Sequence, residues 1–276
     1  MNFVTSSMFG FLAVSTLTVA ASGAIVLNDG STTSNLTLLS STGTAPSTGT
    51  AGTSMSSDGA VITLTSSRDR RTLAYSNTAI ASSTYTVSAE AANNNPGTFA
   101  NRRVGLIGWF NTASLEGIGM YRNQGSGELR LRTLDLDSSN VESVNGLFTT
   151  GGSALASDNF HSSLVQSGTT VRYAFDFQAP TASDLTALPT VTSRVVASVT
   201  SLDGVTTYGS RTFLTNLAAP ADHRVGYFGY LAEDTGALPL GRFDNLSVSE
   251  NAVVPEPTSL AALGMLGAFA LRRRGR

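Results

Sequence analysis

The feature that most constrains this chain is a two-residue alternation of apolar and polar side chains. Val171–Phe177 shows it most clearly, because every second residue from Val171 onward is apolar or aromatic. Tyr85–Glu90 and Glu128–Leu134 repeat the pattern. A period of two places alternate side chains on one face of a strand, whereas an amphipathic helix needs a period of about 3.6. The sequence therefore predicts β-strands that each bury one face.

Segments of this kind follow one another along most of the chain, with turn residues between them. Polar segments with glycine at Asn123–Gly127 and Leu202–Gly204 are predicted turns. Only Ala154–Leu164 is expected to hold a short helix. About ten to thirteen strands are expected, and they include Leu36–Leu39, Ala60–Thr65, Tyr85–Glu90, Val104–Phe110, Gly117–Arg122, Glu128–Leu134, Val171–Phe177, Arg194–Thr200, Thr206–Tyr208, Arg224–Tyr230 and Gly241–Ser249. This pattern favours an all-β fold, an antiparallel β-sandwich.

Four of these segments also resemble a known fold. Their order and residue pattern are similar to those of the concanavalin A-like (laminin-G-like) jelly roll. The segments are the hairpin around Gly125, the strand Tyr173–Phe177, the turn at Asp203–Gly204 and the closing strand Arg242–Leu246. The resemblance implies one jelly-roll domain over residues 25–250.

Missing residue types exclude several kinds of chemistry. The chain has no cysteine and no lysine, which excludes disulfides, thiol nucleophiles, a Walker A lysine and a Schiff-base lysine. The net charge is −2, and four of the seventeen basic residues lie within the last five residues. Without them the chain is clearly acidic, so nucleic acid is not expected as a partner, because its phosphates require a basic surface.

The first 24 residues resemble a secretory signal peptide. An apolar run, Phe9–Ala20, precedes the small residues Ala21–Ala24, which suit signal peptidase. The segment before the run carries only the charge of the α-amino group. We expect signal peptidase to cleave near Ala21–Ala24; the alternative is a buried first strand or helix.

Residues 251–276 fall into three parts. Pro255, Glu256 and Pro257 come first, and each proline holds the residue before it in an extended conformation. Thr258–Leu271 is uncharged and predicts a short apolar helix, shorter than the ~20 residues of a comfortable membrane span. The chain closes with a basic cluster of Arg272, Arg273, Arg274 and Arg276. Such a cluster marks the cytoplasmic side of a membrane.

This order of Pro-Glu-Pro, apolar helix and terminal arginines resembles the PEP-CTERM sorting domain. The resemblance implies that an exosortase-type processing enzyme recognises the tail and cleaves near Pro255–Pro257. It also implies export, with transient anchoring in the inner membrane while the C-terminus stays cytoplasmic. The final location would be the cell envelope or the extracellular matrix.

No catalytic residue is expected. Glycosidases of the concanavalin A-like fold carry Glu-x-Asp-x-x-Glu on one strand, and retaining hydrolysis needs two carboxyl groups about 5 Å apart. Of the seven glutamates, only Glu250 and Glu256 lie within six residues of each other. No Gly-x-Ser-x-Gly elbow is present. His161, in a polar segment, and His223, just before a strand, are expected at the surface.

Calcium is the one cofactor that a segment suggests. Asp135, Asp137 and Asn140 supply oxygen atoms at alternate and loop positions, which is the ligand type that calcium prefers. The alternative is a solvated loop. Glu233–Asp234 and Asp244–Asn245 are weaker oxygen-rich segments, and the latter is expected to be a turn or an inter-strand pair.

Sugar binding commonly uses an exposed aromatic ring. Trp109 is the only tryptophan, but it lies in an apolar strand and is expected in the core. Tyr121 with Arg122, and Tyr230 near Asp234, are alternatives that the sequence does not rank.

The sequence favours a non-enzymatic, exported β-sandwich module of the envelope or matrix that binds glycan, with an extracellular polysaccharide as the expected partner. One alternative is a divergent polysaccharide-degrading enzyme, a glycosidase or lyase, on a jelly-roll scaffold. The other is a purely structural matrix component. The ligand-binding residues are not identified by the sequence.

Overall fold

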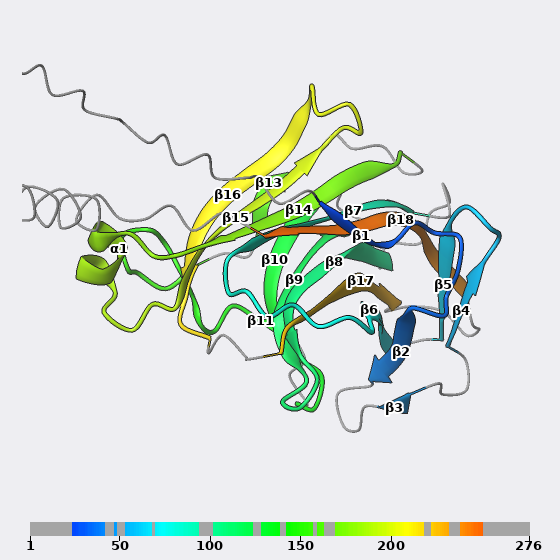
Figure 1. The fold of residues 1–276 in the computed structure, drawn as a ribbon. Coiled ribbons are helices and arrows are strands. Elements are labelled where there is room, and N and C mark those ends of the chain that lie inside the picture. The colour runs from blue at the N-terminus through cyan, green and yellow to red at the C-terminus, as the bar shows by residue number, and fades with distance from the viewer. Residues whose placement is uncertain are drawn as a thin grey trace, which may run out of the picture. The chain divides into compact units, whose positions relative to one another are not determined.

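The computed structural model describes residues 24–41, 47–48, 53–67, 70–93, 102–123, 128–138, 142–156, 159–162, 169–217, 222–231 and 238–250. Within these residues the secondary structure is almost entirely β, with one short helix (Figure 1). Gly23–Asn251 forms one compact unit. The prediction of an all-β fold is therefore confirmed.

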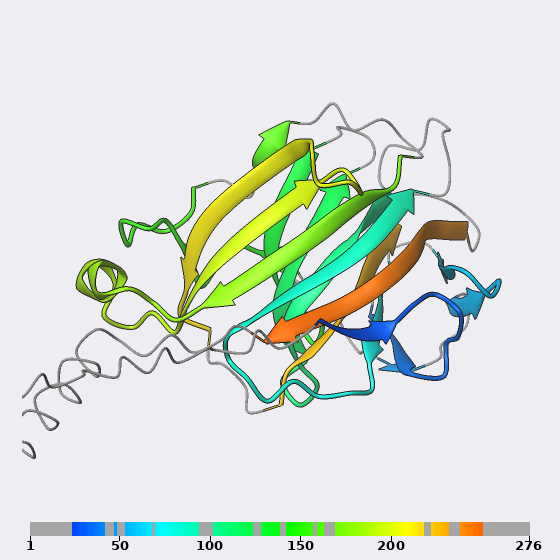
Figure 2. The same ribbon diagram turned by 45° about the horizontal axis from the view of Figure 1, so that its top comes forward.

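The first sheet, which we call sheet A, has nine antiparallel strands. Its order is β12 (Leu147–Phe148), β16 (Thr207–Thr215), β15 (Ser193–Thr200), β14 (Val171–Gln178), β7 (Tyr85–Asn93), β18 (Leu238–Glu250), β5 (Ile62–Ser66) and β4 (Ser54–Ser57), with β1 (Ile25–Asn28) paired to β18. Figure 2 shows β16, β15, β14, β7 and β18 running side by side.

The second sheet, sheet B, also has nine antiparallel strands. Its order is β11 (Glu142–Ser143), β10 (Glu128–Asp135), β9 (Glu116–Asn123), β8 (Arg102–Asn111), β17 (Arg224–Leu231), β6 (Arg70–Ser76), β2 (Leu36–Ser41) and β3 (Ser47–Thr48), with β13 (Asn159–Ser162) paired to β10. Strands distant in sequence are thus neighbours in this sheet, which no local pattern encodes.

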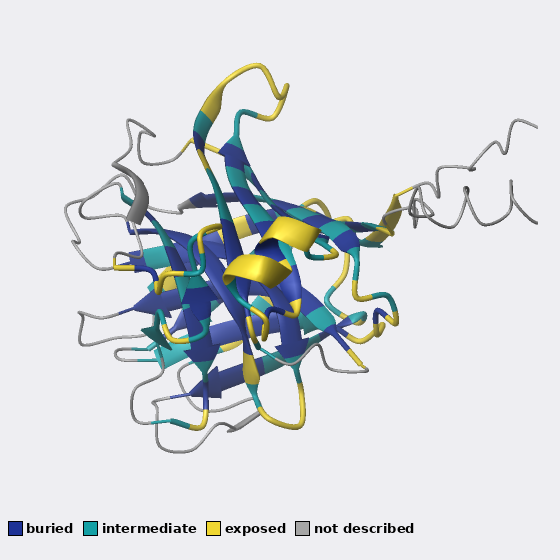
Figure 3. Ribbon diagram, turned by 90° about the vertical axis from the view of Figure 1, so that its left-hand side faces the viewer, coloured by how far each residue is buried: buried dark blue, intermediate teal, exposed yellow. Residues whose placement is uncertain are grey.

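The main hydrophobic core lies between the two sheets and is built by the predicted alternation. Sheet A contributes Tyr85, Val87, Tyr173, Phe175, Phe177 and Phe243, and sheet B contributes Leu106, Met120, Leu131 and Tyr227. The buried residues fill the interior, whereas many loops and the helix are exposed (Figure 3). Truncating one of the buried phenylalanines to alanine should cost about 3–5 kcal/mol. Two antiparallel sheets packed through one core confirm the β-sandwich.

A second hydrophobic cluster lies on the other face of sheet B, which we call its outer face. It contains Leu39, Leu73, Ile107, Phe110, Tyr121, Leu134, Leu136, Phe228 and Tyr230. The hydroxyl of Ser41 on β2 donates to the carbonyl of Leu136, just after β10. Four strands, β9, β8, β17 and β6, lie between β10 and β2 in the sheet order. Sheet B is therefore curled, so that its two sides approach each other across the outer face.

Close strand approach in sheet B requires glycine. A Cβ atom added at Gly105 on β8 would lie 1.9 Å from the carbonyl oxygen of Met120 on β9, the adjacent strand. Real Cβ atoms do not approach backbone oxygen so closely, and backbone cannot move aside as a flexible side chain can. The glycine-rich strands of sheet B thus permit its curl.

The helix prediction for Ala154–Leu164 is wrong. Within the described part of that segment, Ala154 forms an isolated bridge to Phe148, and Asn159–Ser162 is strand β13. Tertiary pairing with β10 decides the conformation there, so His161 pairs through its backbone with Leu129 instead of lying in a loop. The helix is α1, Ala182–Ala187. It begins with a capping box between Thr181 and Asp184, a local signal that a search for long periodicity overlooks.

Trp109 lies in the core, as predicted, and it packs against a buried histidine. The rings of Trp109 and His223 are nearly parallel, with centroids 5.6 Å apart and 4° between their planes. His223 is only 1% exposed, so its expected surface position is wrong. The reason is a backbone bridge to Ile80, which holds His223 beneath the adjoining segment.

The backbone at Trp109 is unusual. Its φ of 53° lies in the left-handed region, at a register shift between Gly108 and Asn111 in the pairing of β8 with β9. A bulky residue rarely adopts this conformation. The Trp109 amide donates to the hydroxyl oxygen of Tyr85 at 3.1 Å, and this bond helps to hold the bulge in place.

Several sequence expectations lie outside the described residues. They are the signal peptide up to residue 23, the sorting tail with Pro255, Glu256, Pro257 and its arginines, the turn residues 124–127, Asn140, and Glu233–Asp234. Among the described residues, we find no helix with both the length and the apolar character that a membrane crossing requires.

Candidate functional site

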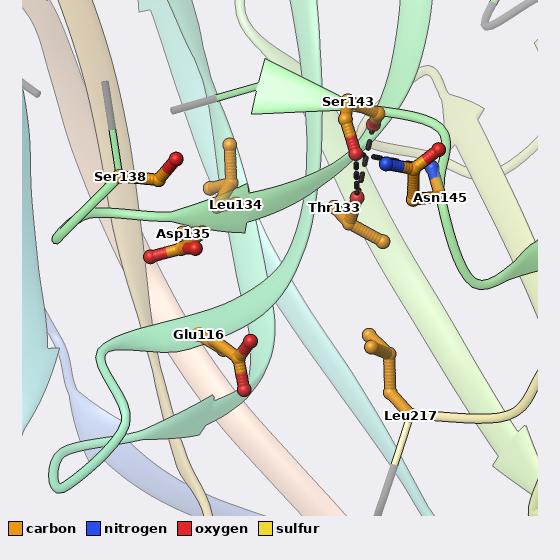
Figure 4. Close-up of a pocket in the computed structure, with 8 residues that line it drawn as sticks. All are labelled: Glu116, Thr133, Leu134, Asp135, Ser138, Ser143, Asn145 and Leu217. Carbon is orange, nitrogen blue, oxygen red and sulfur yellow. Dashed lines mark hydrogen bonds between the residues drawn. The ribbon is translucent and has the colours of Figure 1, made fainter. Parts of the chain in front are cut away.

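A small polar pocket lies beside the hairpin formed by β9 and β10, at the end away from its turn. Its volume is about 240 Å³, and it is lined by Glu116, Thr133, Leu134, Asp135, Ser138, Ser143, Asn145 and Leu217. Figure 4 shows these side chains around one hollow, with Leu217 opposite Glu116. The hairpin supplies the first half of the lining, whereas Leu217 follows β16 of sheet A. The pocket therefore collects residues that are far apart in the sequence.

Two carboxylates come from directly opposed positions of this hairpin. Glu116 begins β9 and Asp135 ends β10, and the two are antiparallel partners. Side chains of opposed residues emerge on the same face of a sheet, with Cβ atoms about 4.5–5.5 Å apart. Strand alternation places both on the face that carries Thr133, which is turned towards sheet A. Spacing along the chain does not reveal this pair, because strand pairing brings Glu116 and Asp135 together across the hairpin.

Hydroxyl groups form the opposite rim of the pocket. The hydroxyls of Thr133 and Ser143, on the paired strands β10 and β11, lie 2.8 Å apart. The Ser143 hydroxyl also accepts a hydrogen bond from the backbone amide of Asn145 at 3.0 Å. These bonds fix the orientation of the short strand β11 against β10. The pocket thus combines fixed hydroxyls, two carboxylates and one amide side chain with an apolar wall at Leu217.

The structure describes two of the three residues expected to bind calcium, Asp135 and Asp137. Asp135 lines the pocket, whereas Asp137 is exposed and is not part of the lining. The Asp135 carboxylate accepts a hydrogen bond from the Asp137 amide at 3.1 Å, which is a local turn contact. Across the residues with described positions, no three carboxylate or histidine side chains gather in a way that could hold a metal ion.

The aromatic candidates for sugar stacking are largely buried. Trp109 and Tyr121 are 3% and 0% exposed, and Tyr230 is 8% exposed, so none presents an open ring face. Burial also raises the pKa of the Tyr121 hydroxyl, with a smaller contribution from the nearby Glu142 carboxylate. None of the described residues that line the pocket is aromatic.

Asp244–Asn245, the other described oxygen-rich segment, lies within β18. The Asn245 amide donates to the Asp244 carboxylate at 2.7 Å, and Asn245 has a φ of 50° at a register shift. Burial raises the pKa of Asp244, and the carboxylates of Glu90 and Asp29 add to this effect while the Asn245 bond opposes it. This segment is a bulge between paired strands, and it does not line the pocket.

Comparison with protein-family models identifies one motif. Residues 253–274 match the PEP-CTERM protein-sorting motif, as expected from the tail. No curated protein matches the chain.

Comparison with solved structures finds similarity at low sequence identity. A lectin from Bauhinia forficata in complex with GalNAc is 11% identical, with a TM-score of 0.47, and the alignment covers 85% of this chain and all of the lectin chain. The exoplasmic/lumenal domain of VIP36, in a Ca²⁺/Man₃GlcNAc-bound form, is 8% identical with the same TM-score, and the alignment covers 76% of this chain and 86% of that domain.

Proposed function

We propose that this protein is an exported module of the cell envelope or extracellular matrix that binds glycan through the pocket at Glu116 and Asp135. It acts without catalysing a reaction. The PEP-CTERM motif at residues 253–274 supports the delivery part of the proposal. The pocket supports the binding part.

Delivery follows from the order of the tail. Signal peptidase removes the leader, and the apolar segment with its terminal arginines holds the chain transiently in the inner membrane, with the C-terminus in the cytoplasm. An exosortase-type enzyme then acts on the extended Pro255–Pro257 site. The sandwich, residues 25–250, is the part that remains to function outside.

The single observation that carries glycan binding is the chemistry of the pocket lining. Sugar hydroxyls are donors and acceptors at once, and the carboxylates of Glu116 and Asp135 accept while Ser143 and Asn145 can do both. Leu217 offers an apolar surface to the C–H groups of a ring. The volume of about 240 Å³ lies below the roughly 300–1,000 Å³ of drug-sized ligand sites, which favours one sugar unit.

A glycan array with the purified unit Gly23–Asn251 tests this proposal. The unit contains both sheets and the core between them, so it is expected to fold by itself. Wild-type protein should bind a defined subset of glycans, and Asp135→Asn, which preserves side-chain shape, should lose that signal. Asp222→Asn, an exposed carboxylate outside the pocket, is the matched control. A flat array with folded protein would leave only a structural role.

One observation favours an enzyme as the second candidate. Glu116 and Asp135 present two carboxylates from adjacent strands, as glycosidases require on either side of a scissile bond. Release of reducing ends from polysaccharide by wild-type protein, lost in both Glu116→Gln and Asp135→Asn, would support this candidate over a binding module.

We also propose that Asp135, Asp137 and Asn140 bind a calcium ion. Asp135 lines the pocket, and Asp137, two residues later, is exposed, which supports oxygen donors at the pocket rim. A calcium ion there would order the rim of the pocket, as hard cations do when carboxylate and amide oxygens surround them.

A further inference from the structure

The outer face of sheet B carries a row of arginines beside two tyrosines. Arg71 on β6, Arg103 on β8, Arg130 and Arg132 on β10 all project to this face, with Tyr121 and Tyr230 between them. Register supports the assignment, because Tyr230 is the direct partner of both Arg71 and Arg103, and Tyr121 is the partner of Arg130. We call these six residues the basic face. The five strands that carry them, from β6 to β10, are neighbours in sheet B (Figure 1).

This concentration of cations stands out against the charge of the chain. The net charge of −2 includes the four arginines of the tail, so the remaining residues together carry −6. Diffuse attraction to polyanions is therefore not expected from the sandwich as a whole. A local cluster of guanidinium groups can nevertheless create a positive potential at one place on an acidic protein.

Tyrosine rings orient two of the guanidinium groups. Arg71 lies 4.3 Å and Arg103 lies 4.8 Å from the centroid of the Tyr230 ring. Arg103 is also 5.2 Å from the Tyr121 ring. Stacking uses the flat face of a guanidinium and leaves its N–H groups in the plane for other partners. The two arginines are thus held side by side and are prepared to donate in parallel.

Among the residues that the structure describes, one carboxylate contacts both of these arginines. Glu142 on β11 contacts both, through a short bond from Arg103 and a 3.7 Å ion pair with Arg71. One carboxylate therefore faces two guanidinium groups. The Nε atoms of both arginines are buried without a hydrogen-bond partner, although the side chains stay 20% and 17% exposed. A second carboxylate, bound at the exposed part of these side chains, would balance the second positive charge.

The flanking arginines extend the same chemistry along the sheet. Arg130 donates two hydrogen bonds to Oε2 of Glu128, from Nε at 3.1 Å and from Nη2 at 2.6 Å. Arg132 lies close enough to Tyr121 for its charge to favour a lower pKa of that hydroxyl, against the larger effect of burial. Four guanidinium groups and the carboxylates of Glu128 and Glu142 thus lie along the basic face. Such an extended, rigid row matches a ligand with repeated negative charges more closely than a single small anion.

We propose that the basic face binds a carboxylate-bearing polysaccharide, a polyuronate, through Arg71 and Arg103. The inference rests on the proposed glycan-binding function and specifies its ligand class. The pocket at Glu116 and Asp135 is rich in carboxylates and would repel a uronate. The two sites would thus engage different sugar units, neutral at the pocket and acidic at the basic face.

The test measures binding of the mature protein to polygalacturonate, to neutral dextran and to double-stranded DNA, over a range of salt concentrations. Polygalacturonate should bind, and its affinity should fall as salt rises. The double variant Arg71→Gln/Arg103→Gln should bind it at least about tenfold more weakly. Arg172→Gln/Arg242→Gln removes two exposed arginines from sheet A and is the matched control, which should bind as the wild type does. Thermal unfolding of every variant checks that each is folded.

Three results would overturn this inference. In the first, the protein does not bind polygalacturonate but binds a neutral glycan, and Asp135→Asn weakens that binding. The polyuronate ligand is then wrong, and the proposed function stands. If the Arg71/Arg103 variant melts earlier but binds polygalacturonate unchanged, these arginines only fasten β11 to the sheet. If DNA binds as tightly as polygalacturonate, the face is a general polyanion surface. Binding of no glycan at all would defeat the proposed function as well.

Discussion

Glu116 and Asp135 face each other across the β9–β10 hairpin and share one wall of the polar pocket. Two like charges at directly opposed positions oppose folding, so a sheet built for stability alone would place a neutral or basic residue at one of them. Both carboxylates line the same pocket, so they can act together on a ligand. Both can accept hydrogen bonds from the hydroxyl groups of one ligand.

Relief of this repulsion should be measurable. Glu116→Gln should raise the free energy of unfolding by about 0.2–1 kcal/mol at low salt, because it removes one of two opposed like charges. Urea unfolding at low and at high salt checks this, since salt should reduce the gain.

The comparison variant is Glu128→Gln, on the same hairpin. Glu128 accepts two bonds from Arg130, so its neutralisation should lower stability and not raise it. A loss of stability in Glu116→Gln as large as that in Glu128→Gln would contradict the repulsion.

The buried His223 should make stability depend on pH. Burial lowers its pKa, and the neighbouring Asp222 carboxylate only partly offsets this. As the pH falls below the ordinary histidine pKa of about 6.5, the unfolded chain takes up the proton first. The free energy of unfolding should therefore be greater at pH 7.5 than at pH 5.5, with a slope of at most about 1.4 kcal/mol per pH unit from this group.

His223→Phe retains an aromatic ring against Trp109 and removes the titration. Urea unfolding of wild type and variant at both pH values isolates the contribution of His223, since His161 is common to both proteins. Equal pH dependence in the two proteins would mean that His223 is not held neutral by the fold.

Calcium should stabilise the wild-type protein if Asp135, Asp137 and Asn140 hold it. A ligand at 100 times its dissociation constant adds about 2.7 kcal/mol to the free energy of unfolding. Thermal unfolding in calcium, compared with chelator, should show a higher midpoint for the wild type and a much smaller shift for Asp135→Asn. An identical midpoint with calcium and with chelator would remove calcium from the account.

The sorting tail gives a prediction in cells. Replacing Pro255 and Pro257 with alanine removes the restriction that keeps the site extended and lets helix propagate upstream from the apolar segment. Processing should then fail, and the full-length chain should accumulate in the membrane fraction. Unchanged size and location of the protein after this replacement would contradict sorting through the Pro-Glu-Pro site.

Local patterns predicted the strands of the sandwich, because alternation directly reports one buried face. Val171–Phe177 lies within β14, and its alternate residues enter the core. The turn at Leu202–Gly204 is also correct, with Gly204 at a φ of 74°. Strand β6, Arg70–Ser76, was not expected, since its paired arginines and small residues hide its alternation.

Long-range pairing limited what could be predicted of the site. The burial of His223 depends on a bridge to Ile80, and the pairing of Glu116 with Asp135 depends on hairpin register. The residues next to His223 in the sequence do not reveal its bridge to Ile80. The separation of Glu116 and Asp135 along the chain does not reveal their pairing either. The turn at residues 123–127 and both flanking strands were predicted, but the predicted strands began at Gly117 and ended at Leu134. Each therefore stopped one residue short of the Glu116–Asp135 pair.

The central claim is that the Glu116–Asp135 pocket binds glycan, and titration calorimetry tests it most directly. A glycan selected on the array is titrated into the wild type, into Asp135→Asn and into the control Asp222→Asn. The account predicts saturable binding by the wild type and the control, and affinity at least about tenfold weaker for Asp135→Asn. Equal affinity in all three proteins, or no binding by folded wild-type protein, would contradict it.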